Sequence, residues 1–319
     1  MTSRGAGKMN YRIIGVDVSK ETLDIFILPE GKHQKLINDS RGFKQLMPHA
    51  TFESTHVIFE PTGQYHKGLE AWLKHNGITY TKVNPRQARR FAEAIGTQAK
   101  TDAVDARLLA KYGQTLEPAP TLPVDDVVLS LKELQVARSA LTKDRTAIRN
   151  RLHATCIPLV QRQLKRQLAL IEKHLTAITD LMKETISSHA QLKQRYDILL
   201  SIPGLGDITA IAMLCEMPEL GSLDSKQVAS LAGLAPMTRQ SGNWKGKACI
   251  RGGRRNVRRA LYMPALVACR YNPDFKRKYE QMIAAGKPAK VAITAIMRKM
   301  IVLANMLIKQ DRKWTENPA

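Results

Sequence analysis

The order of apolar runs in the amino-terminal third constrains the fold of this chain more strongly than any other sequence feature. Two β-rich runs lie within residues 11–28 and flank a polar turn at Ser19–Glu21, which predicts a hairpin. A third strand is expected near 34–38, and strands at 56–60 and 78–83 then alternate with helices. Adjacent strands followed by this alternation predict a mixed α/β sheet rather than a purely parallel one.

Helices are expected in this third around 41–49, 64–76 and 85–96, with another beginning at Asp102 and ending near Gly113. The helix at 64–76 shows helical spacing of its apolar residues, and Gly77 ends it. The order of strands and helices matches a ribonuclease-H-like layout.

The remaining two thirds read as helical. A proline-rich segment at 115–126 predicts a linker, and long helical patterns follow at 126–155 and 160–195, with a break at Pro158. They predict an antiparallel, coiled-coil-like pair that acts either as a dimerising arm or as a helical spacer. An all-α carboxyl-terminal domain is expected, closed by an amphipathic helix at 290–309. The predicted domains are therefore 1–114, 115–195 and 196–319.

Charge limits the class of partner. The chain has 50 Lys and Arg against 28 Asp and Glu, a formal net charge of +22. Such an excess favours a polyanion, because each neutralised phosphate releases condensed counterions. An anionic membrane surface would also attract it, but no uninterrupted apolar run of ~18 residues indicates a spanning helix. The start lacks a signal peptide and the four cysteines form no CxxC pair, so we expect a cytoplasmic protein with reduced thiols.

Four acidic residues lie where strands should end or helices should begin: Asp17, Glu60, Asp102 and Asp105. Asp102 and Asp105 are three apart and would share a helix face. If the three elements are neighbours, four carboxylates converge, which suits Mg²⁺ and phosphodiester chemistry.

Each acid also has a simpler interpretation. Asp102 would be a helix N-cap with Asp105 at its third position, Asp17 a turn residue and Glu60 a solvated strand end. Asp24 alternates with apolar neighbours and is expected on the polar face of its strand.

A glycine motif lies in the carboxyl-terminal domain. Ile202-Pro203-Gly204-Leu205-Gly206 has the pattern of a helix-hairpin-helix. Its glycines would let the backbone approach a phosphate at the start of the next helix. The alternative is an ordinary glycine-rich turn between helices.

The densest basic tract spans 239–259 and contains no acid. Trp244 is interleaved and would stack on a base or simply pack. The basic residues predicted to contact nucleic acid are Arg239, Lys245, Lys247, Arg251, Arg254, Arg255, Arg258 and Arg259. A solvated basic face is the alternative. Ser241 lies inside the tract, and from the residues alone it reads as a loop or cap residue rather than a nucleophile.

Several blocks together resemble DEDD-type insertion-sequence transposases related to the Piv invertases. They are GVDVSKETLDIFI, FEPTGQYHKGLEAWLKHNGI, VNPRQARRFAEAIGTQAKTDAVDARLLAKYG and IPGLGDITAIAMLCEM, followed by LAGLAPMTRQSGNWKGKACIRGGRRNVRRALYMPAL. They span most of 11–113 and 199–270, whereas the middle helices match only in character.

The resemblance implies a RuvC-like domain whose four acids hold Mg²⁺, with Mn²⁺ as a substitute, at the positions Asp17, Glu60, Asp102 and Asp105. It also implies that Ser241 attacks DNA and forms a covalent phosphoserine link, at a composite site often shared between subunits of a dimer or tetramer. The implied partners are donor and target DNA and a structured guide RNA, the bridge RNA.

The function expected from these observations is an RNA-guided DNA recombinase of a mobile element. Basic residues of the first domain would also serve it: Lys82, Arg86, Arg89, Arg90 and Lys100. We expect nucleic-acid binding to depend strongly on salt. The alternatives are a junction endonuclease that uses metal-activated water, a Piv-like DNA invertase and a non-catalytic packaging protein.

Overall fold

The computed structural model describes residues 12–50, 55–97, 101–121, 125–238, 240–242, 244–246 and 248–315. The chain divides into two compact units, Met1–Pro123 and Val124–Ala319. The long middle helices belong to the second unit. The three-part division at 114 and 195 therefore remains a prediction.

The first unit is built on a mixed five-stranded sheet with the strand order β3-β2-β1-β4-β5. Its strands are β1 (Arg12–Val18), β2 (Thr22–Leu28), β3 (Lys32–Ile37), β4 (Thr55–Phe59) and β5 (Thr79–Lys82). β1 pairs antiparallel with β2 and parallel with β4, and β5 continues the parallel part. The predicted mixed sheet is confirmed, and the first strand is central.

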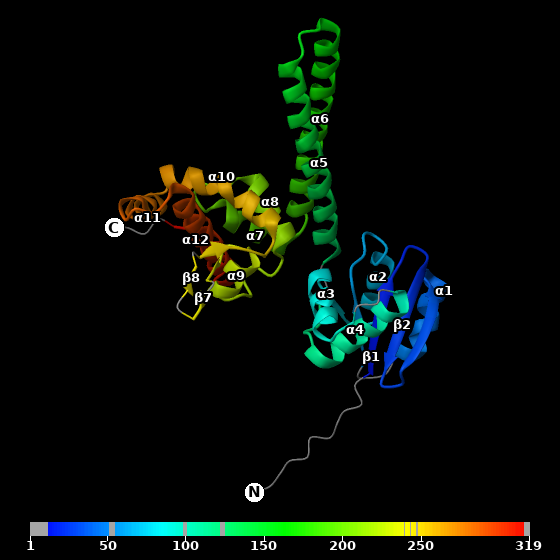
Figure 1. The fold of residues 1–319 in the computed structure, drawn as a ribbon. Helices are drawn as coiled ribbons and strands as arrows, with labels where there is room; N and C mark the ends of the chain where they lie inside the picture. Colours follow the sequence, from blue (N-terminus) through cyan, green and yellow to red (C-terminus); the bar gives the residue numbers. More distant parts are fainter. Residues whose placement is uncertain are drawn as a thin grey trace. The chain divides into compact units, whose positions relative to one another are not determined.

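Four helices cover the two faces of this sheet: α1 (Ser40–Ala50), α2 (Lys67–His75), α3 (Pro85–Ala94) and α4 (Asp102–Leu116). Alternate residues of β1 face opposite ways. Ile14 and Val16 pack with α1 and α2, whereas Ile13 packs with α3 and α4, and Figure 1 shows these helices around the sheet. The sheet is therefore buried on both sides and its residues alternate between two apolar clusters.

Gly15 sets how closely α4 approaches β1. A Cβ on Gly15 would lie 2.1 Å from the carbonyl oxygen of Ala106 and 2.3 Å from the amide nitrogen of Ala110. Because only glycine leaves this space empty, the helix lies directly on the central strand. This contact fixes the helix that carries two of the four acids.

The proline-rich segment after α4 is partly fastened to the sheet. The Thr121 amide donates to the Tyr80 carbonyl at 2.8 Å, and the Lys82 amide donates to the Thr121 hydroxyl at 2.9 Å. The Thr81 hydroxyl donates to the Ala119 carbonyl at 2.9 Å. The predicted linker is thus docked on β5 as far as Thr121, because the edge strand offers unpaired backbone groups.

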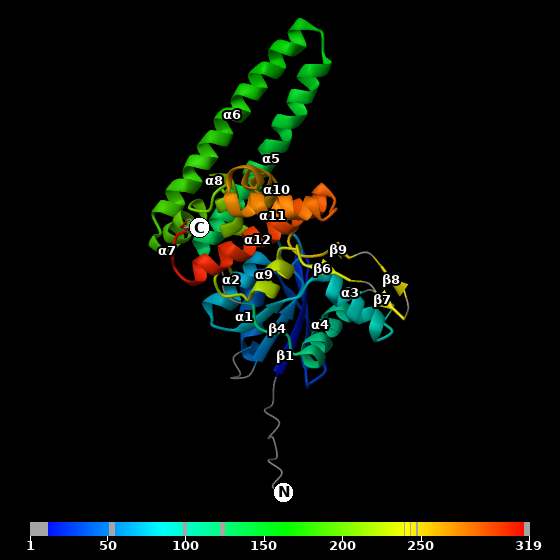
Figure 2. The ribbon, with the colours of Figure 1, turned by 90° about the vertical axis from the view of Figure 1, so that its left-hand side faces the viewer.

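Two long helices form a hairpin in the second unit: α5 (Asp126–Ala154) and α6 (Pro158–Ser187). They lie side by side in Figures 1 and 2, joined by a hydrogen bond from Arg138 to Thr179 and an ion pair between Arg149 and Glu172. The antiparallel pair is confirmed, while its coiled-coil character and its dimerising role remain predictions.

The helix predicted at 160–195 is in fact two helices. α6 ends at Ser187, and α7 (Ala190–Leu200) begins after Ser188 and His189. The Ser188 hydroxyl donates to the Thr185 carbonyl at 2.9 Å, so a side chain satisfies a carbonyl of the last turn.

The rest of the second unit contains α8 (Asp207–Glu216), α9 (Ser225–Leu231), α10 (Arg255–Tyr271), α11 (Pro273–Ala284) and α12 (Ala289–Lys309). The predicted helical character of this region is confirmed, but the region is not purely helical, because four two-residue strands form between α9 and α10. They are β6 (Pro236–Met237), β7 (Gln240–Ser241), β8 (Trp244–Lys245) and β9 (Cys249–Ile250). β6 pairs with β9 and β7 with β8, since the glycines of this segment allow it to turn back on itself.

α12 forms part of the core of the second unit. By length and composition it is the one helix in the described parts of the chain that could cross a membrane. However, its apolar face, which includes Ile296, Met300 and Leu307, is buried against α7, α9 and α10. These residues therefore already have protein neighbours.

Candidate active site

Asp17 and Glu60 lie at the same edge of the sheet. Asp17 is the sixth residue of β1, and Glu60 directly follows Phe59, the last residue of β4. Because β1 and β4 are parallel neighbours, their carboxyl ends meet at this edge.

Asp102 and Asp105 are both in the first turn of α4. The N-cap is Thr101, whose hydroxyl accepts a hydrogen bond from the Val104 amide at 3.3 Å. The interpretation of Asp102 as an N-cap is therefore wrong. Both acids instead stand at the positive end of the helix, where negative charge is favoured.

One cavity of about 860 Å³ is lined by all four acids. Lys20 and Arg89 add cationic groups to its wall, and the half-exposed ring of Tyr65 also borders it. The structure thus brings together carboxylates from β1, the end of β4 and α4, as the sequence predicted. Their catalytic role stays a prediction.

The carboxylates interact electrostatically. Burial raises the pKa of Asp17 to about 6, and the charges of Asp105, Asp102, Asp24 and Glu60 add to that effect in this order. Negative charge is therefore concentrated around Asp17, and a bound cation would reduce the repulsion between these carboxylates.

The donor set suits a hard cation, because every candidate ligand offers carboxylate oxygen. Among the described residues, however, no group of three or more His, Cys, Asp or Glu side chains is close enough to hold one ion together. A metal at this cavity would therefore require these acidic side chains to come closer together. Their chemistry fits Mg²⁺, and their present spacing is wider than direct ligation needs.

Asp24 is a further acid that acts electrostatically on Asp17, and its sequence context predicts a position on a polar face. It lies opposite Asp17 in the β1–β2 ladder, but it is only 4% exposed. His33 Nε2 lies 2.9 Å from its Oδ1, and Lys35 Nζ lies 3.4 Å from its Oδ2. The expectation of a solvated residue is wrong because α4 covers this face. The available sequence signal was the pair His33 and Lys35, which lie two residues apart on the neighbouring strand and offer partners for the Asp24 carboxylate.

Ser241 lies in the second unit, in the β7–β8 hairpin. It is exposed and pairs in register with Trp244, whose side chain is 60% exposed. Gly242 follows with a φ of 55°, a turn conformation that glycine adopts without strain. The hydroxyl is thus presented on a short hairpin whose neighbouring aromatic ring faces solvent.

The basic tract separates into paired and exposed members. Arg254 donates to both carboxylate oxygens of Glu219, at 2.6 and 2.7 Å, and to the Glu216 carbonyl. Burial opposes ionisation of Glu219, yet the hydrogen bonds from Arg254 hold its pKa below the ordinary value. An acid distant in sequence therefore balances Arg254.

The other members differ in exposure. Arg258 donates to the Gly252 carbonyl, whereas Arg251, Arg255 and Arg259 are exposed. Arg239, Lys247 and the side chain of Lys245 lie outside the described residues.

The basic residues of the first unit divide in the same way. Lys82 forms an ion pair with Glu70 at 2.5 Å. Arg86, Arg89 and Arg90 are exposed on α3, with Arg89 3.6 Å from Glu93, and Lys100 lies outside the described residues. The α3 arginines are therefore better placed for phosphates than Lys82.

The two glycines of the predicted helix-hairpin-helix play different parts. Gly204 has a φ of 95° and lies against α10, where an added Cβ would be 3.0 Å from the Pro264 carbonyl oxygen. Gly206 is the N-cap of α8 and has open space around it. Asp207 follows, with its pKa lowered by hydrogen bonds from Lys183 and Tyr196. A paired carboxylate thus already stands at this helix start, and the phosphate-binding role remains a prediction.

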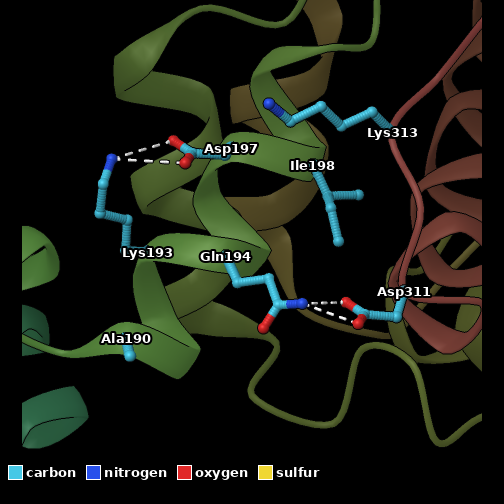
Figure 3. A pocket seen from close by; sticks show the side chains of 7 residues that line it. All are labelled: Ala190, Lys193, Gln194, Asp197, Ile198, Asp311 and Lys313. Carbon is cyan, nitrogen blue, oxygen red and sulfur yellow. Dashed lines mark hydrogen bonds and ion pairs between the residues drawn. The ribbon is translucent and has the colours of Figure 1, made fainter.

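A second, smaller cavity of about 410 Å³ lies between α7 and the chain after α12 (Figure 3). Gln194 donates to both carboxylate oxygens of Asp311, at 2.6 and 2.7 Å, and Lys193 pairs with Asp197. The Gln194–Asp311 contact fastens the chain after α12 to α7, whereas the Lys193–Asp197 pair lies within α7.

Two family profiles match the chain. The profile of DEDD-type IS110 transposases, described as a transposase, covers residues 14–156, and that of the transposase IS116/IS110/IS902 family covers 196–280. The first match contains all four acids, and the second contains Ser241.

Relatives extend these matches along the whole chain. The pilin gene-inverting proteins of Moraxella bovis and Moraxella lacunata are each 31% identical over 316 residues, covering 95% of this chain and 98% of theirs. The 44.8 kDa protein of insertion element IS116 from Streptomyces clavuligerus is 23% identical over 98% of this chain and 95% of its own.

The mixed sheet, the cavity of carboxylates and these matches define a DNA-processing enzyme of the transposase and recombinase class. The chain belongs to the IS116/IS110/IS902 family of transposases.

Proposed function

We propose that this chain is an RNA-guided DNA recombinase that moves an insertion sequence through a covalent phosphoserine intermediate with Mg²⁺ assistance. The observation that carries the proposal is the cavity lined by Asp17, Glu60, Asp102 and Asp105, in which burial and neighbouring negative charge raise the pKa of Asp17 to about 6. Such a site is suited to a divalent cation and a phosphodiester.

The proposed chemistry assigns distinct tasks to the two units. A bound Mg²⁺ supplies Lewis-acid stabilisation of charge on the scissile phosphate. Lys20 and Arg89, on the wall of the same cavity, orient the flanking phosphates. The Ser241 oxygen attacks phosphorus and loses its proton as the Oγ–P bond forms. The phosphorus–oxygen bond to the deoxyribose breaks, and the leaving oxygen takes up a proton. A DNA hydroxyl then attacks the phosphoserine and releases Ser241.

The adduct gives the direct test. Wild-type protein is incubated with labelled donor DNA, its guide RNA and Mg²⁺, then resolved on a denaturing gel. Ser241→Ala should abolish the protein–DNA adduct and retain RNA binding, whereas Asp102→Asn should abolish both the adduct and cleavage. Ser139→Ala, at an exposed serine on α5, is the matched control.

Three results would redirect the proposal. An adduct that persists in Ser241→Ala removes the serine assignment. Cleavage by that variant without any adduct favours the junction endonuclease. If wild-type protein forms no adduct and cleaves no DNA, and Asp102→Asn binds nucleic acid as well as wild type does, a non-catalytic packaging protein is favoured.

The guide RNA has its own support and test. A folded RNA together with donor and target DNA accounts for the net charge of +22 and for the exposed arginines on both units. Because the chain is expected in the cytoplasm of a bacterium or archaeon, it should co-purify with a structured RNA. Ribonuclease treatment should stop recombination, and the purified RNA should restore it. If ribonuclease treatment leaves recombination unchanged, the proposal that a guide RNA is required is wrong.

Inversion is the second candidate function. It is favoured by the 31% identity, over 95% of this chain, to proteins named for inverting a pilin gene. A plasmid that carries two element ends in inverted orientation separates the reactions, since inversion reorders the plasmid and excision releases a circle.

A further inference from the structure

The outward face of α10 carries arginine and aromatic side chains that the proposed chemistry does not use. Arg255, Arg259 and Tyr262 follow the spacing i, i+4, i+7, so they form one stripe, and all three are exposed. Met263, Val267 and Arg270 form a second exposed stripe with the same spacing beside it. Tyr271 ends the helix with 76% of its surface exposed. These seven residues are the α10 outer face.

The opposite side of α10 explains why this face points outward. Val257, Leu261, Ala265 and Ala268 are buried in the core of the second unit together with α12 and α8. The helix thus has one complete buried face, and its exposed apolar and aromatic residues are additional to what the core requires.

α10 is also held firmly. Pro264 lies inside the helix and has no N–H for the Ala260 carbonyl. The Thr209 hydroxyl on α8 lies 3.4 Å from that carbonyl and donates to it. The helix therefore presents its outer face from a fixed position on a packed unit.

The composition of the face indicates the chemistry of its partner. The segment Arg255–Tyr271 contains four arginines, no Lys and no Asp or Glu. Cations without acids on the same helix favour a phosphate backbone. Tyrosine rings interleaved with those cations favour bases whose flat faces are accessible. In a duplex the bases are stacked on one another, so only an unpaired strand offers such faces to a tyrosine.

We propose that the α10 outer face binds a single-stranded segment of nucleic acid, with Tyr262 and Tyr271 stacking on unpaired bases and Arg255, Arg259 and Arg270 contacting phosphates. The two tyrosines are nine residues apart, which is about 14 Å along the helix axis and about half a turn around it. A strand that reaches both rings therefore crosses the α10 outer face obliquely, over the exposed side chains of Arg259 and Arg270. The inference rests on the proposed function only in taking nucleic acid as the substrate.

Binding measurements on the full-length protein test this surface independently of recombination. Fluorescence anisotropy compares a labelled oligo(U) RNA, an oligo(dT) DNA and a blunt duplex of the same length at one salt concentration. Tyr262→Ala and Tyr271→Ala should each weaken binding of an unpaired strand by about 5- to 100-fold and leave duplex binding unchanged. The RNA and DNA arms identify which unpaired strand the face prefers.

Two controls separate stacking from charge and from folding. Tyr262→Phe keeps the aromatic ring and should retain binding. Arg277→Ala removes one positive charge from α11, where Arg277 pairs with Asp274, and should not discriminate between single strand and duplex. Circular dichroism should show unchanged melting for every tyrosine variant, since both rings are exposed.

Equal losses for duplex and single strand, or no loss in either tyrosine variant, would overturn the inference. If wild-type protein forms no adduct but the tyrosine variants lose single-strand binding, the proposed chemistry is wrong and the inference about the α10 outer face is retained. If the adduct forms but the tyrosine variants bind normally, only the inference about the α10 outer face is wrong.

Discussion

Asp17 carries its negative charge at a position where burial and neighbouring carboxylates both oppose it. Its folded-state pKa of about 6 lies above the ordinary value of 3.8. Stability linked to this group is therefore present below pH 3.8 and is lost as pH rises through 6. Asp17→Asn should accordingly raise the free energy of unfolding at pH 7 by about 1–2 kcal/mol, after allowance for the partial exposure of the side chain.

Thermal unfolding followed by circular dichroism shows whether Asp17→Asn is more or less stable than wild type at each pH. The advantage of Asp17→Asn over wild type should shrink between pH 6 and pH 4, where the wild-type carboxyl gains its proton. DNA cleavage should be lost at every pH. A variant that is less stable than wild type at pH 7 would show that Asp17 is held by favourable contacts rather than opposed by its neighbours.

Arg254 and Arg255 are adjacent in sequence and differ in role. Arg254→Ala leaves Glu219 half-buried without its bidentate partner, so it should destabilise the second unit by about 1–3 kcal/mol. Arg255→Ala should change stability by less than about 0.5 kcal/mol, weaken nucleic-acid binding and reduce the slope of log K against log salt by about 1. Denaturant unfolding and a salt titration of both variants test this contrast. Equal stability of the two variants would contradict the different roles of Arg254 and Arg255.

At the scale of elements, the contact of α4 with β1 positions the acids. Gly15→Ala would push a methyl group into the backbone of α4, so it should destabilise the first unit by about 3 kcal/mol or more and abolish cleavage. Gly206→Ala is the matched control, because nothing lies within 4 Å of its added Cβ and its φ of −99° suits alanine. Urea unfolding measures both, and a Gly15→Ala protein as stable as Gly206→Ala would contradict the close approach.

Most elements of the first unit follow from local sequence, because the short apolar run in RIIGVDV and the helical spacing after Gln64 are clear local signals. The convergence of the acids could be predicted because parallel strands bring their carboxyl ends together. The burial of Asp24 and the pairing of Arg254 with Glu219 could not, since both depend on which distant element covers a residue. The two-residue strands around Ser241 are too short to leave a periodic signal.

At the scale of the whole molecule, the two units have separate cores. The apolar clusters of the first unit draw on residues between Ile13 and Tyr112, and the cluster of the second draws on residues from Val127 to Trp314. The clusters of the first unit share no residue with the cluster of the second unit. The two units are joined through the segment that follows Thr121. We therefore expect two unfolding transitions rather than one.

Differential scanning calorimetry of the full chain tests this division, because each variant should shift only its own transition. Gly15→Ala should lower the first unit's transition and Arg254→Ala the second's, and the double variant should show the sum, since the sites share no partner. Mg²⁺ should raise the transition that Gly15→Ala lowers, by linkage to the carboxylate cavity, and Asp17→Asn should reduce this response. A single transition that both substitutions shift together would mean that the two cores unfold as one cooperative structure.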